Sequence, residues 1–271
     1  SIKECVVAID IKSDTTWATS FQDRQVNILN GATLTVSVPM ALDTVMMEED
    51  AQVVFTATEG KLTARSLRFA PLLSATGWKA FGMPFTSAVI KNSTEEEISA
   101  PSTQNVDNGI WFARLKDNKT PEFVVDESAF GMAGLWAANG DTYTISSEGA
   151  FEFKTLEEPA APTETGTFLM CSNPNTFTIT LKQSAYILTA DGTSFEQEAN
   201  PEIKPFQSFV LTDAKTLSTL RSLRIGDGVV TGNQTIEPVD GYDYRSWRYR
   251  DPHAGAYGRG DHRNEWQGRL S

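Results

Sequence analysis

The chain has 271 residues, of which 40% are hydrophobic and 10% aromatic, so it can bury one large core or two ordinary cores and is not wholly disordered. Its formal net charge of -12 argues against a general binder of nucleic acid or of anionic membranes, because both partners require a basic surface. No window approaches the roughly 18 consecutive apolar residues of a membrane-spanning helix, so no membrane-spanning segment is expected.

Residues 24–73 consist of short apolar runs separated by acidic or glycine-containing breaks. The runs begin about eight to twelve residues apart, which is the spacing of consecutive short strands, and no helical pattern lies between them. Two architectures fit this segment. It is either part of an antiparallel sheet or a few rungs of a parallel β-solenoid whose flat face is built from the valine and leucine positions.

Between residues 75 and 153, strand-like runs alternate with turns. Strands are expected at Trp78–Phe85, Gly109–Leu115, Glu122–Val125, Tyr143–Ile145 and Ala150–Phe153, with an exposed loop at Lys91–Asn108. Gly131, Gly134 and Gly140 are expected to interrupt the chain around Trp136. The polar segment Thr155–Gly166 is either a domain linker or a long surface loop, and we favour the loop because strand-like sequence continues on both sides.

The stretch from Thr176 to Asp213 carries the clearest strand signals. Its apolar residues alternate with threonines from Phe177 to Leu181, which places them on one face of a strand. Asp191-Gly192 then predicts a tight type I′ turn between two antiparallel strands, with Phe195 on the returning strand. The predicted fold is all-β: a strand-rich segment over residues 1–73 that could be a short β-solenoid, an antiparallel β-sandwich over residues 74–232, and a disordered tail over residues 233–271.

The residues that could support catalysis are poorly arranged for it. Both histidines, His253 and His262, fall in the tail, so a Ser-His-Asp triad is not expected in the folded body. The two cysteines, Cys5 and Cys171, are too far apart in sequence to indicate a zinc site or a disulfide framework. The runs Glu95–Glu97 and Glu157–Glu158 lie in polar loops, where carboxylates are usually solvated. We therefore expect no enzyme activity, no metal and no cofactor.

Three tryptophans are the candidate ligand-binding residues. Trp78, Trp111 and Trp136 could form an exposed platform for sugar rings, whose apolar C–H faces stack on aromatic rings. Aromatic residues in strands more often fill a core, and we favour that role for most of them. Trp136 is the best candidate for exposure, because glycines flank it instead of an alternating strand pattern.

Four segments resemble modules of secreted and surface proteins from Gram-negative gut and oral anaerobes, in which a β-sandwich follows solenoid or leucine-rich-repeat segments. They are ATGWKAFGMPF at 75–85, GIWFARL at 109–115, SAYILTADGTSFEQE at 184–198 and IKPFQSFVLTD at 203–213. The resemblance implies an exported or cell-surface, non-catalytic module for adhesion or scaffolding, with a host or cell-surface protein or a glycan as partner. The alternative is a carbohydrate-binding accessory module. A third function, as a fragment of a solenoid-type enzyme that acts on polysaccharides, is not favoured, because the sequence shows no assembled pair of acidic residues.

The tail departs from the family pattern. After Val239 it contains six arginines and no Val, Ile, Phe or Met, so it cannot build a core. Codons permitted for Asp240–Leu270, read one base later, encode strand-like sequence that ends in Gly-Arg-Val, as the family's terminal strands do. We hypothesise that the tail is a frameshifted version of those strands; a stop codon in the shifted frame of the gene would refute this.

Overall fold

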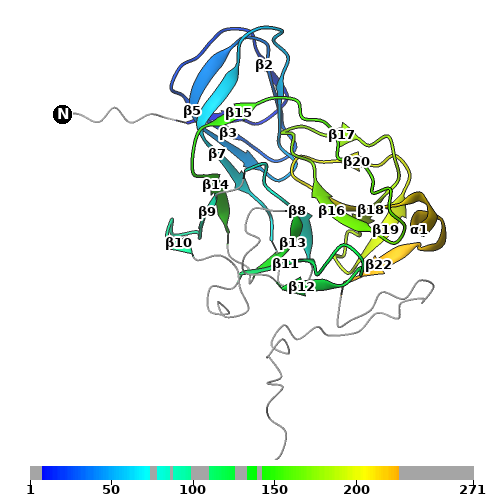
Figure 1. The fold of residues 1–271 in the computed structure, drawn as a ribbon. Coiled ribbons are helices and arrows are strands. Elements are labelled where there is room, and N and C mark those ends of the chain that lie inside the picture. Colours follow the sequence, from blue (N-terminus) through cyan, green and yellow to red (C-terminus); the bar gives the residue numbers. More distant parts are fainter. Residues whose placement is uncertain are drawn as a thin grey trace, which may run out of the picture. The chain divides into compact units, whose positions relative to one another are not determined.

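The computed structural model describes residues 8–73, 78–85, 88–98, 110–125, 133–138 and 142–225 (Figure 1). These residues form strands and, within the described ranges, a single six-residue helix, which confirms the all-β prediction. The elements are β1 Ile9–Ile11, β2 Thr15–Trp17, β3 Gln25–Ile28, β4 Thr33–Val36, β5 Met40–Glu48, β6 Gln52–Phe55, β7 Leu62–Ala70, β8 Lys79–Phe81, β9 Ala88–Lys91, β10 Glu97–Ile98, β11 Ile110–Leu115, β12 Phe123–Val125, β13 Gly134–Ala138, β14 Thr144–Ser147, β15 Phe151–Phe153, β16 Phe168–Ser172, β17 Ile179–Thr180, β18 Ala185–Leu188, β19 Ser194–Glu198, β20 Glu202–Ile203, β21 Ser208–Thr212, α1 Ala214–Thr219 and β22 Ser222–Arg224.

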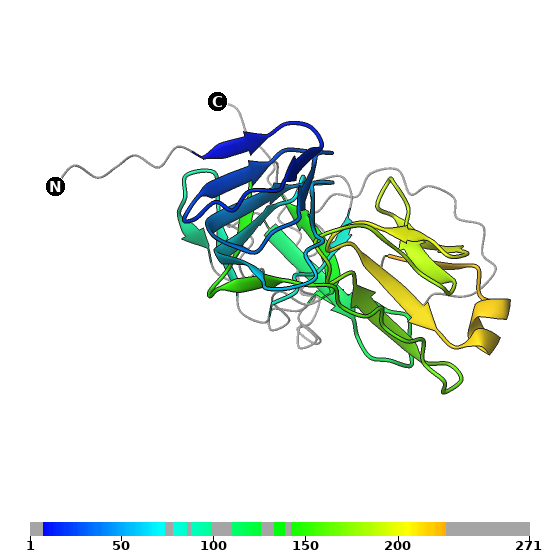
Figure 2. The same ribbon diagram turned by 90° about the horizontal axis from the view of Figure 1, so that it is seen from above.

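The N-terminal strands form a β-solenoid-like arrangement of parallel rungs. Strands β1, β3, β5 and β7 pair in that order, and β2, β4 and β6 form a second parallel sheet. Figure 2 shows the blue strands of successive rungs side by side. In the second sheet, Leu34 lies 19 residues after its partner Thr15 and 19 residues before its partner Val53. Of the two architectures that fit residues 24–73, the parallel solenoid is therefore the one present.

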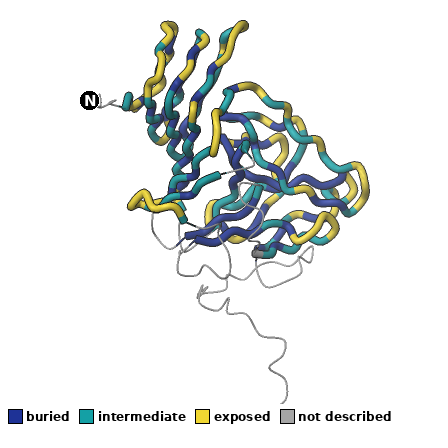
Figure 3. Tube along the Cα trace, turned by 60° about the vertical axis from the view of Figure 1, so that its left-hand side comes forward, coloured by how far each residue is buried: buried dark blue, intermediate teal, exposed yellow. Residues whose placement is uncertain are grey.

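The solenoid core is built from rows of apolar side chains that stack from rung to rung. Paired positions place Val26 beside Val45 and Val45 beside Leu67, and all three are fully buried. Their sequence neighbours are only half-buried, since successive side chains of a strand alternate between its two faces. Figure 3 shows buried and less buried positions alternating along the chain. At the first rung, Trp17 lies against the half-buried ring of Phe21, with ring centroids 4.9 Å apart.

The two longest strands bend at a corner where their alternation breaks. In β5, Leu42 and Val45 are buried while Asp43 and Thr44 between them are not, and β7 shows the same shift around Arg65. Two consecutive outward side chains turn the strand onto another face of the solenoid. Arg65 then contacts Asp43 at 3.2 Å and Asp23 at 2.5 Å, so opposite charges meet at the corners of successive rungs.

The last rung is covered by later parts of the same chain. Strands β14 and β15 pair antiparallel with β7, and β9 and β10 extend the same sheet to eight strands. At the edge of the other sheet, the amide of Val53 donates to the carbonyl of Thr176 at 2.7 Å, and the Thr176 hydroxyl donates to the carbonyl of Val53 at 2.7 Å. The eight-stranded sheet thus continues past the boundary expected at residue 73, and the described residues belong to one compact unit.

Two buried asparagines, Asn173 and Asn175, bind the backbone of the segments next to Thr176, where the later part of the chain meets the last rung. Asn173 is fully buried, and its side-chain amide donates to the carbonyls of Phe177, Ile203 and Lys204 at 2.8–3.1 Å. Asn175 exchanges two hydrogen bonds with the backbone of Leu156, at 2.7 and 3.1 Å. Leu156 lies in the segment Thr155–Gly166, which therefore packs against the folded body, as expected of a loop and not of a free linker.

A four-stranded sheet, ordered β12-β11-β13-β8, separates two hydrophobic cores. On β11, Phe112 packs into the solenoid core while Ala113 and Leu115 pack into a second core. The second core also contains Tyr186 and Phe195 from a five-stranded antiparallel sheet, ordered β16-β21-β18-β19-β22. The four-stranded sheet is therefore buried on both faces.

The predicted hairpin is present, but its turn type is not the predicted one. Strands β18 and β19 pair antiparallel, with Leu188 opposite Phe195. A type I′ turn needs positive φ at both central residues, whereas Gly192 has φ of 70° and Asp191 lies outside the positive-φ set. The Asp191 carboxylate accepts hydrogen bonds from Thr189 Oγ1 at 2.6 Å and from the Thr193 amide at 3.1 Å. These bonds favour an Asp-stabilised turn followed by a left-handed glycine.

The last described part of the chain contains helix α1 and strand β22. Asp213 caps α1, because its carboxylate accepts hydrogen bonds from the amides of Lys215 and Thr216 at 3.0 and 3.1 Å. The tail expected from residue 233 lies outside the described residues, as do His253 and His262.

Candidate functional site

The three candidate tryptophans do not form an exposed platform. Trp136, which was the best candidate for exposure, is fully buried, in keeping with the core role favoured for most of the tryptophans. Its indole stacks on Phe81 with ring centroids 4.7 Å apart, and its Nε1–H donates to the Phe81 carbonyl at 3.0 Å. Trp111 is buried at 9% exposure, and Trp78 is half-buried against the second core.

Gly134 explains why the glycines around Trp136 misled the prediction. Gly134 begins strand β13 and does not interrupt it. A Cβ atom at this position would overlap the ring of Phe112 and would lie 2.8 Å from the carbonyl oxygen of Ala113. The glycine is therefore needed for close packing between β13 and β11, and this packing buries the neighbouring Trp136.

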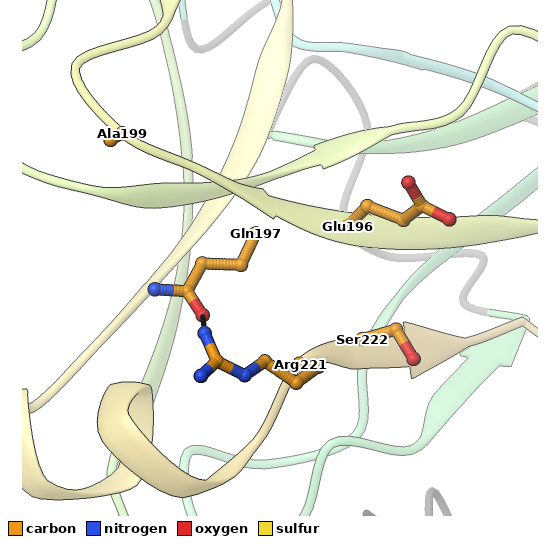
Figure 4. A pocket seen from close by; sticks show the side chains of 5 residues that line it. All are labelled: Glu196, Gln197, Ala199, Arg221 and Ser222. Carbon is orange, nitrogen blue, oxygen red and sulfur yellow. Dashed lines mark hydrogen bonds between the residues drawn. The ribbon is translucent and has the colours of Figure 1, made fainter. Parts of the chain in front are cut away.

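A depression with a volume of about 500 Å³ lies in the five-stranded sheet, at β19 and β22 (Figure 4). Glu196 and Gln197 come from β19, Ser222 from β22 and Arg221 from the residue before it, while Ala199 follows β19. Arg221 donates to Gln197 Oε1 at 3.4 Å, and the Glu196 carboxylate is exposed.

This lining offers polar groups for a ligand but only one of the two carboxylates that a glycosidase uses. It offers one carboxylate, one guanidinium, one amide and one hydroxyl, which together can donate to and accept from a polar group or a peptide backbone. A glycosidase needs two carboxylates across a cleft, and Glu196 is the only carboxylate among these five residues. The alternation of Glu196 and Glu198 with buried Phe195 was the sequence signal for this solvent-facing surface.

A smaller depression of about 230 Å³ is lined by aromatic, proline and charged side chains. The residues are Pro84, Phe85, Ala150, Phe151, Glu152, Lys154, Leu156, Pro174 and Thr176. Phe85 and Phe151 are half-buried, so parts of both rings reach the surface. The Glu152 carboxylate forms an ion pair with Lys61 at 2.7 Å. Neither phenylalanine was a candidate in the sequence, because their exposure depends on loops from distant parts of the chain.

The most strongly perturbed titratable groups in the described ranges each have a structural cause. Burial raises the pKa of the Cys171 thiol to about 12. Burial also raises the pKa of Tyr186 to about 12, and its hydroxyl donates to the Leu220 carbonyl at 2.7 Å. Hydrogen bonds from the Thr216 hydroxyl, and from the amides of Thr216, Gly166 and Lys215, hold the pKa of Asp213 well below its usual range.

The carboxylate runs named from the sequence lie at the surface. Glu95, Glu96 and Glu97 are exposed around a turn in which Asn92 Oδ1 accepts from the Thr94 and Glu96 amides, each at 3.0 Å. Glu157 is also exposed, and Glu158 accepts from the Lys182 amide at 3.3 Å. Within the described part of the chain, no group of three or more His, Cys, Asp or Glu side chains is placed to hold a metal ion.

The short helix α1 cannot cross a bilayer, and the described residues contain no other helix that could. Comparisons of the chain with models of known protein families, with curated proteins and with solved structures found no match in any of the three.

Proposed function

We propose that the chain is a non-catalytic module of an exported or cell-surface bacterial protein, with a role in adhesion or scaffolding. The observation that carries this proposal is the structural origin of the three largest pKa perturbations. Functional sites usually contain groups whose pKa values are shifted by burial or by neighbouring charges. Here Cys171 and Tyr186 are core residues, and Asp213 is a helix cap, so none of the three lines either depression.

In this proposal, the four-stranded and five-stranded antiparallel sheets pack as the predicted sandwich on the end of the solenoid. Their shared core, which includes Leu135, Phe195 and Val210, supports that arrangement. A solenoid joined to such a unit without a flexible linker suits a scaffold, because repeat rungs present an extended surface at fixed spacing. The polar depression at Glu196 and Arg221 is the proposed contact for a protein partner.

A second candidate function is carbohydrate binding, and the smaller depression favours it. The accessible parts of Phe85 and Phe151 can stack on the apolar face of a sugar, while Glu152 and Lys154 can bond to its hydroxyls. This site replaces the tryptophan platform, whose main candidate, Trp136, is buried.

Binding measurements on the purified full chain test both candidates. The chain is applied to immobilised extracellular-matrix proteins, to intact epithelial cells and to a glycan array. Adhesion predicts binding to protein or cell surfaces that is lost in the double variant Glu196→Lys/Arg221→Glu. Lys215→Glu, an exposed position on α1, is the matched control and should retain binding.

The carbohydrate candidate predicts a different pattern in the same assays. Phe151→Ala should abolish a glycan signal, whereas Glu196→Lys/Arg221→Glu should leave it unchanged. Absence of binding to every protein, cell and glycan tested contradicts both candidates. Localisation is tested separately by digesting intact producing cells with protease: protection of the chain until the cells are lysed contradicts a surface location.

A further inference from the structure

The two ends of the solenoid differ in whether other described segments of the chain cover them. At the last rung, β7 is covered by β14 and β15, and the Thr176 segment bonds to β6. At the first rung, β1 pairs with β3 on one side, and none of the described residues pairs with its other side. A strand edge of this kind presents unpaired backbone donors and acceptors that can bind another strand.

The backbone direction of β1 identifies which residues face that edge. The carbonyl of Ile11 accepts a hydrogen bond from the Leu29 amide at 3.0 Å, so Ile11 points its backbone groups toward β3. Backbone groups of successive strand residues point to opposite sides, so those of Asp10 and Lys12 point toward the open edge. Both side chains are exposed; Asp10 accepts from Asn27 Nδ2 at 3.0 Å, and no described residue forms an ion pair with Lys12.

We propose that this edge binds a second copy of the chain, with the two β1 strands antiparallel about a two-fold axis at Ile11. In this register Asp10 lies opposite Lys12 of the other copy, and Lys12 lies opposite its Asp10. Each such pair exchanges two backbone hydrogen bonds, because these are the residues whose N–H and C=O groups face outward. Each pair also joins opposite charges across the strands.

Charge selects this register over the neighbouring one. A shift of the axis to Asp10 would place two aspartates opposite each other, which is destabilising. In this register the two Ile11 residues lie opposite each other, and the half-buried Ile9 lies opposite Ser13 of the other copy. A three-residue strand gives a small interface, so the dimer forms at chain concentrations of roughly 0.1 mM and above, as transient contacts do.

Sedimentation equilibrium of the full chain with charge variants tests the proposal. Asp10→Lys and Lys12→Asp each replace both ion pairs by like-charge contacts, and each should raise the dissociation constant by about tenfold or more. The combined variant Asp10→Lys/Lys12→Asp restores opposite charges and should return the constant to within about threefold of the wild type. Lys12→Asp keeps the Asp10–Asn27 hydrogen bond, so its effect cannot come from loss of that contact.

Three outcomes would overturn the proposal. The first is a wild-type chain that stays monomeric up to about 1 mM. The second is a dimer whose constant is unchanged in both single variants. The third is strong hydrogen-exchange protection of the Asp10 and Lys12 amides in dilute monomer, which would mean that residues of the same chain occupy the edge. The proposed function does not depend on any of these results.

Discussion

Replacing Trp136 by alanine should destabilise the protein severely without exposing or removing a binding surface. The indole is fully buried, stacks on Phe81 at 4.7 Å and meets Phe112 edge-on at 4.8 Å. Its Nε1–H also donates to the Phe81 carbonyl at 3.0 Å. The substitution therefore removes ring packing in the solenoid core and one buried hydrogen bond.

The expected loss follows from these contacts. Truncation of a buried tryptophan to alanine costs about 3–5 kcal/mol of unfolding free energy. For a domain of this size, a loss of 1 kcal/mol lowers Tm by roughly 2–4 °C, so a loss of about 4 kcal/mol lowers it by roughly 8–16 °C. Trp136→Phe keeps most of the ring packing and should cost about 1–3 kcal/mol, mainly through the lost hydrogen bond.

Urea unfolding followed by circular dichroism, together with calorimetry, measures both losses. Leu72→Ala is the matched control, because Leu72 is 61% exposed and its truncation should change stability by no more than about 0.5 kcal/mol. A loss below about 1.5 kcal/mol for Trp136→Ala would show that the indole is not packed as described. If Trp136→Ala lost glycan binding while its stability stayed unchanged, the hypothesis of an exposed tryptophan platform would be supported instead.

Three further predictions concern single side chains. Gly134→Ala should cost at least about 1–3 kcal/mol in urea unfolding, because its Cβ would overlap Phe112, and stability equal to the wild type would contradict the close packing. Because the pKa of Asp213 is lowered in the folded state, its carboxylate adds stability above pH 3.8, and this stability is lost as the pH falls further. Asp213→Asn should therefore reduce the loss of unfolding free energy on acidification, whereas the same loss in variant and wild type would rule out the cap. Burial raises the pKa of Cys171 from 9.0 to about 12, so the free energy of unfolding should fall as the pH rises between these values, because only the unfolded thiol ionises there. Cys171→Ala should make this fall with pH less steep, and an equally steep fall in the variant would contradict the burial of the thiol.

The candidate binding residues were the least predictable part of the chain. Sequence reasoning chose tryptophans because exposed aromatic rings bind sugars, but the sheets on both sides of β13 bury Trp136. The accessible aromatic residues, Phe85 and Phe151, come from segments far apart in sequence. The Glu196–Arg221 depression likewise joins two strands through a pairing that no local pattern encodes.

Local patterns by themselves determined that the protein is all-β, where many of its strands lie and that β18 and β19 form a hairpin. These features depend on side-chain alternation and on turn residues, which act over a few neighbouring positions. These patterns left open whether the strands within residues 24–73 pair in parallel or antiparallel, because a short apolar run looks the same in a parallel rung and in an antiparallel strand.

The tertiary structure decided the rest through contacts between distant residues. It chose the parallel rungs, in which Thr15, Leu34 and Val53 pair at intervals of 19 residues, and it buried β13 on both faces. It also brought the amide of Gly166 to the carboxylate of Asp213 at 2.8 Å, across 47 positions of the sequence. In each case, the stability of a segment's conformation depends on which surface covers it, and that surface comes from another part of the chain.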